Sequence, residues 1–297
     1  MSFALYVMTQ KGHAVLEGIL ARLPAGAIRM VITARDPHIQ NDFYEEIHAT
    51  CQNAGVQIVD KNAAQAIRSD YALAISWRWM IRGIPNLIVL HDSLLPRYRG
   101  FAPLPSALIN GEGEVGVSAI FATGDYDTGD IIGQRRLKVT YPIKIQQVIQ
   151  GLIPLYVSVA GDVCSSLAAG IDLPRQKQDD SQATYSLWRD DLDYEIDWSW
   201  DAERVKRFID AVSYPYLGAR TQLNQEPVLI LDAMPEGDVR IENRTPGKVI
   251  FMRDGQPTVV CGTGLIRITQ ITTLDGEPLL PLKHFRTRFG ASRLRTD

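Results

Sequence analysis

Short apolar runs alternate with segments of helical spacing through the first half of the chain. Within 12–23, for example, apolar residues fall three or four positions apart, which is the spacing of one buried helix face. The pattern predicts strands at 3–8, 30–33, 57–59, 71–76, 87–91, 116–122 and 131–140, and helices at 12–23, 42–54, 103–110 and 143–169. This alternation favours an α/β fold with a Rossmann-like, parallel-rich sheet and helices on both of its faces.

The second half of the chain has a different pattern of apolar and polar residues. A polar stretch at 173–184 indicates a surface loop, and an amphipathic helix is expected at 201–212 with Ser199 or Asp201 as its N-cap. Closely spaced strands separated by glycine-containing turns follow, at 228–231, 247–252, 258–261 and 265–271. We therefore predict three parts: a large domain over 1–200, a connecting helix and loop over 201–224, and a small β-barrel-like domain over 225–297.

Composition excludes several classes of protein. The formal net charge of −3 gives no general attraction to nucleic acid or acidic membranes. The three cysteines are far apart and form no CxxC pair, so we expect reduced, partly buried thiols and no metal site. The apolar run at 3–8 is too short for a signal peptide or a membrane span, and we expect no other segment of membrane length. These features predict a cytoplasmic protein without a membrane partner.

His91 is the first candidate for chemistry, because it ends a predicted buried strand. Ligands bind at the carboxyl ends of strands in open α/β sheets, and an imidazole exchanges protons near neutral pH. A structural hydrogen-bonding histidine is the alternative. The loop that follows contains Ser93, Arg97, Tyr98 and Arg99. Its arginines suit a phosphate or carboxylate, although a solvated loop has the same composition.

A second candidate is the acidic, glycine-flanked segment 124–130, which follows the predicted strand 116–122. Its three aspartates are compatible with a plain turn. A calcium-type loop is a weaker alternative, since no glutamate completes the twelve-residue pattern. A third possibility is that one carboxylate orients and charges the imidazole of His91.

Together these motifs resemble those of the 10-formyltetrahydrofolate-dependent formyltransferase family, which includes sugar N-formyltransferases and methionyl-tRNA formyltransferases. The resemblance is strong over about 70–140 and weaker at 196–199, 214–219 and 246–264. It is carried by His91-Asp92-Ser93-Leu94-Leu95-Pro96, Arg99-Gly100, Pro103, Gly116-Val117 and Asp127-Thr128-Gly129-Asp130, in that order. The family has an accessory C-terminal β domain, as expected here.

The resemblance implies the roles of individual residues. His91 and Asp127 match the family's pair that flanks the reacting formyl group. The cosubstrate 10-formyltetrahydrofolate is expected between two segments whose members are Ser76, Trp77, Arg78, Trp79 and Met80 on one side and Asp125 and Tyr126 on the other. Simple packing is the alternative role of the two tryptophans. The acceptor is expected to meet Ser93, Arg97, Tyr98 and Arg99, with no metal taking part.

Two positions depart from the family pattern. The family usually has an asparagine two residues before the histidine, donating to the formyl oxygen, and Val89 stands there. Losing one such donor typically costs about a hundred- to a thousand-fold in rate. Asn86 lies three residues earlier and is not expected to substitute. Asp92, where a small residue is common, is the second change. Either His91 suffices with another donor, or a different polar group fills the gap, or the site binds without catalysis.

The acceptor is inferred from charge. The segment 34–46 corresponds to a basic loop of the tRNA enzymes, but here it is short and net acidic. The region 225–297 has ten Lys/Arg and nine Asp/Glu, which is nearly balanced. We therefore expect an amino sugar on a nucleotide, for polysaccharide (lipopolysaccharide) biosynthesis, with Tyr98 or Trp188 stacking on it. No nucleic-acid partner is expected, and a homodimer is possible. The alternatives are a methionyl-tRNA formyltransferase and a catalytically impaired folate-binding homologue.

Overall fold

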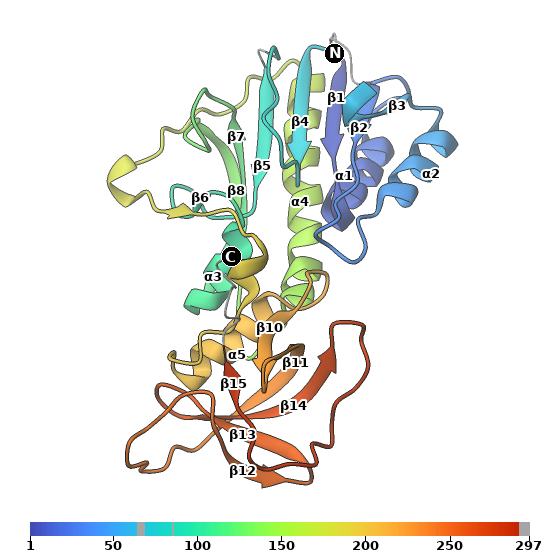
Figure 1. The fold of residues 1–297 in the computed structure, drawn as a ribbon. Helices are drawn as coiled ribbons and strands as arrows, with labels where there is room; N and C mark the ends of the chain where they lie inside the picture. The colour runs from blue at the N-terminus through green and yellow to red at the C-terminus, as the bar shows by residue number, and fades with distance from the viewer. Residues whose placement is uncertain (64–68, 85, 291–297) are drawn as a thin grey trace. The chain divides into compact units, whose positions relative to one another are not determined.

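The computed structural model describes residues 1–63, 69–84 and 86–290, which form two compact units (Figure 1). The first unit consists of 1–104, 113–139 and 147–188. The second consists of 105–112, 140–146 and 189–297. Each unit is built around its own sheet.

The sheet of the first unit has seven strands in the order β3-β2-β1-β4-β5-β7-β8. Pairing is parallel from β3 to β5, and β7 and β8 add in antiparallel fashion, so the sheet is mixed. The strands are β1 (Phe3–Val7), β2 (Ile28–Thr33), β3 (Ile58–Asp60), β4 (Tyr71–Ile75), β5 (Leu87–His91), β7 (Glu114–Phe121) and β8 (Ile131–Lys138). The predicted Rossmann-like α/β class is confirmed, and each predicted strand of this unit is present with ends shifted by at most two residues.

Helices and short elements complete this part of the chain. The helices are α1 (Thr9–Arg22), α2 (Tyr44–Ala54), α3 (Pro103–Asn110) and α4 (Ile145–Ala168), and a short 3-10 turn covers Lys61–Ala63. Two-residue strands β6 (Arg99–Gly100) and β9 (Tyr185–Ser186) pair in parallel, and a 3-10 turn, Asp180–Gln182, precedes β9. The pattern of apolar residues did not predict β6 or β9, because two residues are too few to have a period.

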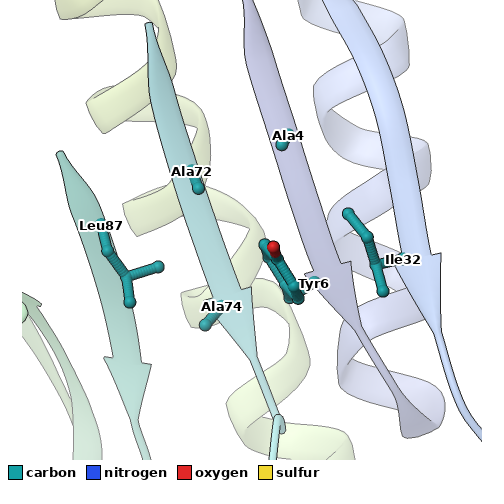
Figure 2. Packing of buried hydrophobic residues seen from close by; sticks show 6 residues of the cluster. All are labelled: Ala4, Tyr6, Ile32, Ala72, Ala74 and Leu87. Carbon is teal, nitrogen blue, oxygen red and sulfur yellow. The ribbon is translucent and has the colours of Figure 1, made fainter. Parts of the chain in front are cut away.

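One face of the central sheet carries buried apolar side chains (Figure 2). The buried side chains on this face are Ala4, Tyr6, Ile32, Ala72, Ala74 and Leu87. They come from alternate positions of four adjacent strands, as expected where successive side chains point to opposite faces. Trp77, Ile81 and Ile84, from the segment after β4, pack against them. The segment implied to bind folate is therefore anchored on the sheet by its apolar side chains.

The second unit contains a six-stranded antiparallel sheet, helix α5 (Ala202–Ala211) and most of α3. The strand order is β12-β13-β14-β11-β10-β15. The strands are β10 (Ala219–Leu223), β11 (Glu226–Glu236), β12 (Val249–Arg253), β13 (Gln256–Val260), β14 (Leu265–Thr273) and β15 (Phe289–Gly290). Asp201 caps α5, since its carboxylate accepts a hydrogen bond from Arg204 N at 2.8 Å. A C-terminal β region was predicted and is present.

The extent of this unit differs from our predicted boundaries at 200 and 224. Strand β10 lies inside the segment 201–224 that we predicted as helix and loop only. Residues before 200 also belong here, because main-chain hydrogen bonds tie them to the sheet: Ile196 N donates to Arg220 O and Gly262 N donates to Trp198 O. A 3-10 turn, Asp191–Tyr194, starts this segment. Long-range pairing of this kind has no local sequence signal.

Helix α4 corrects one expectation from the sequence. It has 24 residues with a mean hydropathy of 1.4, which is long and apolar enough to cross a membrane by composition. Half of that apolar window is buried inside the protein, as for the core helix of a soluble protein. Its buried side chains include Leu152, Tyr156 and Val159.

The three cysteines are buried and free, and burial raises the pKa of Cys51 to about 11.

A largely buried ion pair fixes the strand that ends at His91. Lys11 of α1 pairs with Asp92, and Tyr156 of α4 donates to the same carboxylate at 2.5 Å. Burial raises the pKa of Asp92, but the charge and hydrogen bond of Lys11, with the hydrogen bond of Tyr156, outweigh it and hold the pKa below its ordinary value. Side chains from α1 and α4 thus hold Asp92, the residue next to His91.

Replacing Lys11 with methionine is expected to lower the free energy of unfolding by about 3 kcal/mol at neutral pH, because a buried carboxylate loses its counter-charge. Since the folded pKa of Asp92 is depressed, this stabilisation is fully present above about pH 4 and disappears as the pH falls through the folded pKa. Urea unfolding at several pH values measures the loss of unfolding free energy and its dependence on pH. Arg35→Met, which removes an exposed partner of Glu45, is the control and should lower the free energy of unfolding much less, because solvent screens an exposed ion pair. Equal losses in the two variants would contradict the assignment.

Candidate functional site

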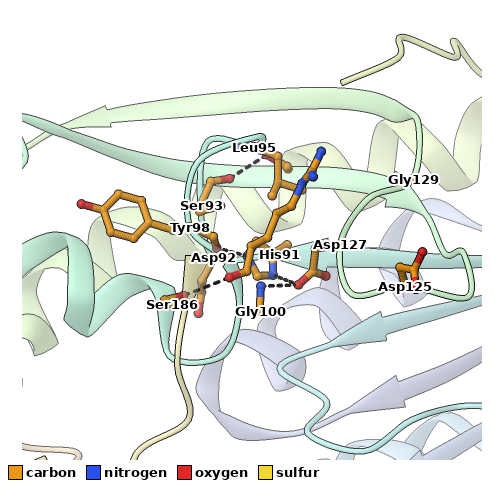
Figure 3. A network of polar contacts seen from close by, with 12 residues as sticks. His91, Asp92, Ser93, Leu95, Tyr98, Gly100, Asp125, Asp127, Gly129 and Ser186 are labelled. Atoms are coloured by element: carbon orange, nitrogen blue, oxygen red, sulfur yellow. Dashed lines mark hydrogen bonds and ion pairs between the residues drawn. The ribbon is translucent and has the colours of Figure 1, made fainter. Parts of the chain in front are cut away.

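The imidazole of His91 is buried at the end of β5 and is held on one side by the main chain (Figure 3). Its Nε2 lies 2.8 Å from Tyr98 O. A carbonyl oxygen only accepts, so Nε2 carries a proton in this arrangement. Nδ1 lies 3.5 Å from Asp127 Oδ2. In the neutral ring Nδ1 carries a lone pair instead of a hydrogen. It is therefore the nitrogen that can accept a proton.

Asp127 reaches His91 by an indirect route. Strand β7 runs antiparallel to β5 with His91 opposite Ser118, so the turn after Phe121 starts beside the other end of β5, near Ile88. The turn folds back, and Gly100 N donates to Asp127 Oδ2 at 2.8 Å. Asp127 adopts a left-handed φ of 55°, which is uncommon for a residue other than glycine. The carboxylate is thereby fixed between Gly100 and the histidine.

A buried polar cluster, not predicted from the sequence, holds the loop that leaves β5. Ser118 Oγ donates to Ser93 O at 2.6 Å and accepts from Leu95 N at 3.1 Å. Gln134 Nε2 donates to Leu95 O at 2.9 Å. Serine and glutamine on strands carry no signal for such a role, and only the β5–β7–β8 pairing brings them to the loop.

The four residues predicted to meet the acceptor separate into two pairs. Ser93 and Arg99 are buried and bond within the protein: Ser93 Oγ donates to Arg97 O at 2.7 Å, and Arg99 binds Gln178 and Asp180. The side chain of Arg99 is 2% exposed and its guanidinium bonds to protein acceptors, which does not favour the predicted contact with an acceptor. Arg97 is exposed, with its guanidinium 5.3 Å from the ring centroid of a half-buried Tyr98.

The residues implied to bind folate form an aromatic segment after β4. Trp77 packs edge-on against Tyr6 and Trp79, with ring centroids 5.1 and 5.3 Å apart. Ser76 has a φ of 55°, and its Oγ is buried with no hydrogen-bond partner among the described residues. Trp79 and Met80 are exposed. The segment thus presents aromatic surface beside an unsatisfied hydroxyl.

The remaining residues of that prediction lie in other surroundings. Arg78 pairs with the buried carboxylate of Asp36. Asp125 lies farther along the turn from His91 than Asp127 does (Figure 3). Tyr126 is exposed, with its ring centroid 5.2 Å from that of Phe101.

Val89 lies on the same face of β5 as His91 and is surrounded by apolar side chains. It packs against the buried cluster of Leu95, Ile120 and Ile131. Asn86 does not fill the missing role, because its Nδ2 donates to Asp70 O at 3.0 Å near the start of the strand. Within 1–63, 69–84 and 86–290, no three His, Cys, Asp or Glu side chains gather as metal ligands would.

Two family descriptions match the chain in order. Residues 35–151 match "Formyl transferase" and residues 190–287 match "Formyl transferase, C-terminal domain". A methionyl-tRNA formyltransferase of Roseiflexus sp. (strain RS-1) is 32% identical over 222 residues, which is 72% of this chain and 66% of that protein. A methionyl-tRNA formyltransferase of Geobacter sulfurreducens is also 32% identical and is covered over 62% of its length. The chain thus spans less than two thirds of these relatives.

Solved structures share the fold at low identity. The N-formyltransferase from Helicobacter canadensis, in complex with folinic acid and dTDP-3-aminofucose, superposes with a TM-score of 0.67 at 13% identity, covering 90% of this chain and 98% of that one. Methionyl-tRNA formyltransferase from Clostridium thermocellum gives a TM-score of 0.55 at 18% identity, covering 79% and 93%. At these identities the likeness concerns the fold alone.

Proposed function

Because this chain belongs to the formyl transferase family, we propose that it transfers the formyl group of 10-formyltetrahydrofolate to a primary amine. The observation that carries the proposal is the His91–Asp127 pair, with Nδ1 of the imidazole 3.5 Å from the carboxylate. An imidazole held in this way takes a proton at Nδ1, and the carboxylate stabilises the imidazolium that forms.

His91 and Asp127 can carry the proton that the attacking amine loses to the folate nitrogen that leaves. The amine nitrogen bonds to the formyl carbon, and the carbonyl π electrons move to its oxygen. His91 Nδ1 then accepts the proton that the amine loses. The bond from the formyl carbon to the folate nitrogen breaks as the C=O bond re-forms, and His91 returns its proton to that leaving nitrogen. Asp127 remains ionised throughout, and binding both reactants together supplies much of the remaining rate.

The residues present suit the cosubstrate. A flat heterocycle with a hydrogen-bonding edge needs aromatic surface and polar groups without other partners. The buried hydroxyl of Ser76 and the rings of Trp77 and Trp79 supply these. We place the pterin along 76–80, with Asp125 and Tyr126 on its other side.

For the acceptor, we propose an amino sugar carried on a nucleotide, used in polysaccharide biosynthesis. The Helicobacter canadensis enzyme of the same fold binds such a compound. In this chain the side chain of Arg97 is exposed and its charge suits a diphosphate, and the exposed ring of Trp188 suits stacking.

Charge in the loop between β2 and α2 supports a small-molecule acceptor. Arg35 is the cation of this loop, and it pairs with Asp42 and Glu45. Binding of tRNA requires several cations that release counterions from phosphates, and a cation already neutralised by carboxylates contributes little.

Initiator tRNA is the second candidate acceptor, favoured by the sequence relatives at 32% identity. Filter binding at low salt separates the two candidates. Salt-dependent binding of initiator tRNA would support the second, and no binding would remove it.

The proposed function is tested by incubating the protein with 10-formyltetrahydrofolate and a panel of nucleotide-linked amino sugars. Mass spectrometry should detect an N-formylated product from at least one sugar. Folate binding without turnover on any sugar or on charged initiator tRNA would contradict the proposal. That result would identify a folate-binding homologue whose catalysis is impaired at Val89.

A further inference from the structure

Gln178 connects two features of the site that lie far apart in the chain. Its Oε1 accepts hydrogen bonds from Arg99 Nε at 3.0 Å and Arg99 Nη2 at 2.9 Å. Its Nε2 donates to Asp127 O at 2.7 Å and to Gly129 O at 2.8 Å. The amide thus joins a buried arginine of β6 to the turn that carries the Asp127 carboxylate.

The orientation of this amide is determined by its neighbours. A guanidinium only donates, so the amide oxygen faces Arg99 and the NH2 group faces the two carbonyls. Arg99 itself is 2% exposed, and Asp180 also accepts from its Nη2, at 2.7 Å. A fixed arginine therefore fixes the direction in which Gln178 donates.

The turn around Asp127 needs such support. A residue other than glycine in a left-handed conformation costs about 1–3 kcal/mol, and external contacts must maintain it. Gly100 N holds the Asp127 carboxylate, and Gln178 holds the main chain of the same residue. With both in place, the carboxylate is directed at Nδ1 of His91.

We propose that Gln178 is a positioning residue that holds Asp127 against His91, and that Arg99 serves this role by orienting the Gln178 amide. The proposal deepens the proposed function, on which its kinetic consequence rests. It gives Arg99 a role inside the protein in place of a contact with the acceptor. It also gives the polar segment 173–184 a part in the chemistry.

The test is Gln178→Glu, which keeps the size and the acceptor facing Arg99 but places a carboxylate oxygen against two carbonyl oxygens. The turn should shift, and kcat should fall about 10- to 100-fold with little change in the KM for folate. Gln176→Glu is the matched control: it makes the same change at an exposed position of the same segment. Gln178→Met removes the amide without adding charge and should lower kcat in the same direction.

A second measurement does not depend on activity. The ring nitrogens of His91 are observed by NMR in 15N-labelled protein and assigned with the His91→Ala variant. Their chemical shifts should change in Gln178→Glu and Gln178→Met and stay unchanged in Gln176→Glu. An unchanged His91 signal in folded Gln178 variants overturns the proposal, whatever their activity. If the wild-type protein formylates no acceptor, the proposed function fails, and the NMR signal still decides the role of Gln178.

Discussion

Replacing His91 with alanine is expected to lower kcat for formyl transfer by about 10²- to 10⁴-fold, the usual contribution of one general acid–base group. The variant loses the imidazole whose Nδ1 lies 3.5 Å from Asp127 Oδ2. Binding of folate should persist, because the aromatic side chains of the segment 76–80 remain in place. Single-turnover kinetics and a folate-binding titration measure the two effects independently.

His38→Ala is the matched control for this variant. His38 is an exposed histidine in the loop between β2 and α2, and its removal should leave kcat unchanged. Full activity of His91→Ala would exclude the proton transfer proposed here. Loss of folate binding together with activity would instead assign His91 to the binding of the cosubstrate.

The strands of the sheet and the position of His91 were predictable from the sequence, because a buried strand appears in the sequence as a short run of neighbouring apolar residues. Strand β5 is a short apolar run bounded by polar residues, and its predicted ends, 87 and 91, are those observed. The same local signals gave α3, which begins and ends where predicted. A short apolar run bounded by polar residues is typical of a strand that is buried on both faces.

The meeting of His91 and Asp127 was not predictable from the residues alone. Strand direction decides which end of a strand a turn lies beside, and nothing in 116–122 indicates an antiparallel strand. The antiparallel β7 places the turn beside the start of β5, so only its folding back brings Asp127 to the histidine. The resemblance to a family supplied this pair before the geometry did.

Gln178 and the Lys11–Asp92 pair escaped prediction for a related reason. Lys11 and Asp92 are 81 residues apart, and Gln178 and Arg99 are 79 residues apart. Charged and amide side chains usually lie in solvent, so their residue types indicate exposure. Their burial becomes favourable only when a partner from a distant segment is in place, and a sequence pattern does not contain that partner.

The environment of Val89 explains what the missing asparagine changes. Across the sheet, Tyr6 is opposite Ala74, Ala74 is opposite Val89, and Val89 is opposite Ile120. Between Ala74 and Ile120 this row is apolar, so the side chains flanking position 89 offer no hydrogen-bond donor. An oxyanion forming beside His91 then depends on the imidazolium or on a donor from a position other than 89.

Val89→Asn is therefore expected to raise kcat, by up to about 100-fold, because one oriented amide donor is typically worth about 10²- to 10³-fold in rate. The same change places an amide among Leu95, Ile120 and Ile131, so the free energy of unfolding should fall by about 1–3 kcal/mol. Single-turnover rates and urea unfolding measure both effects. Val89→Ala is the control, since it opens equal or greater space without a donor. If Val89→Asn is no faster than Val89→Ala, the oxyanion is stabilised from another direction, and position 89 has lost its catalytic role in this chain.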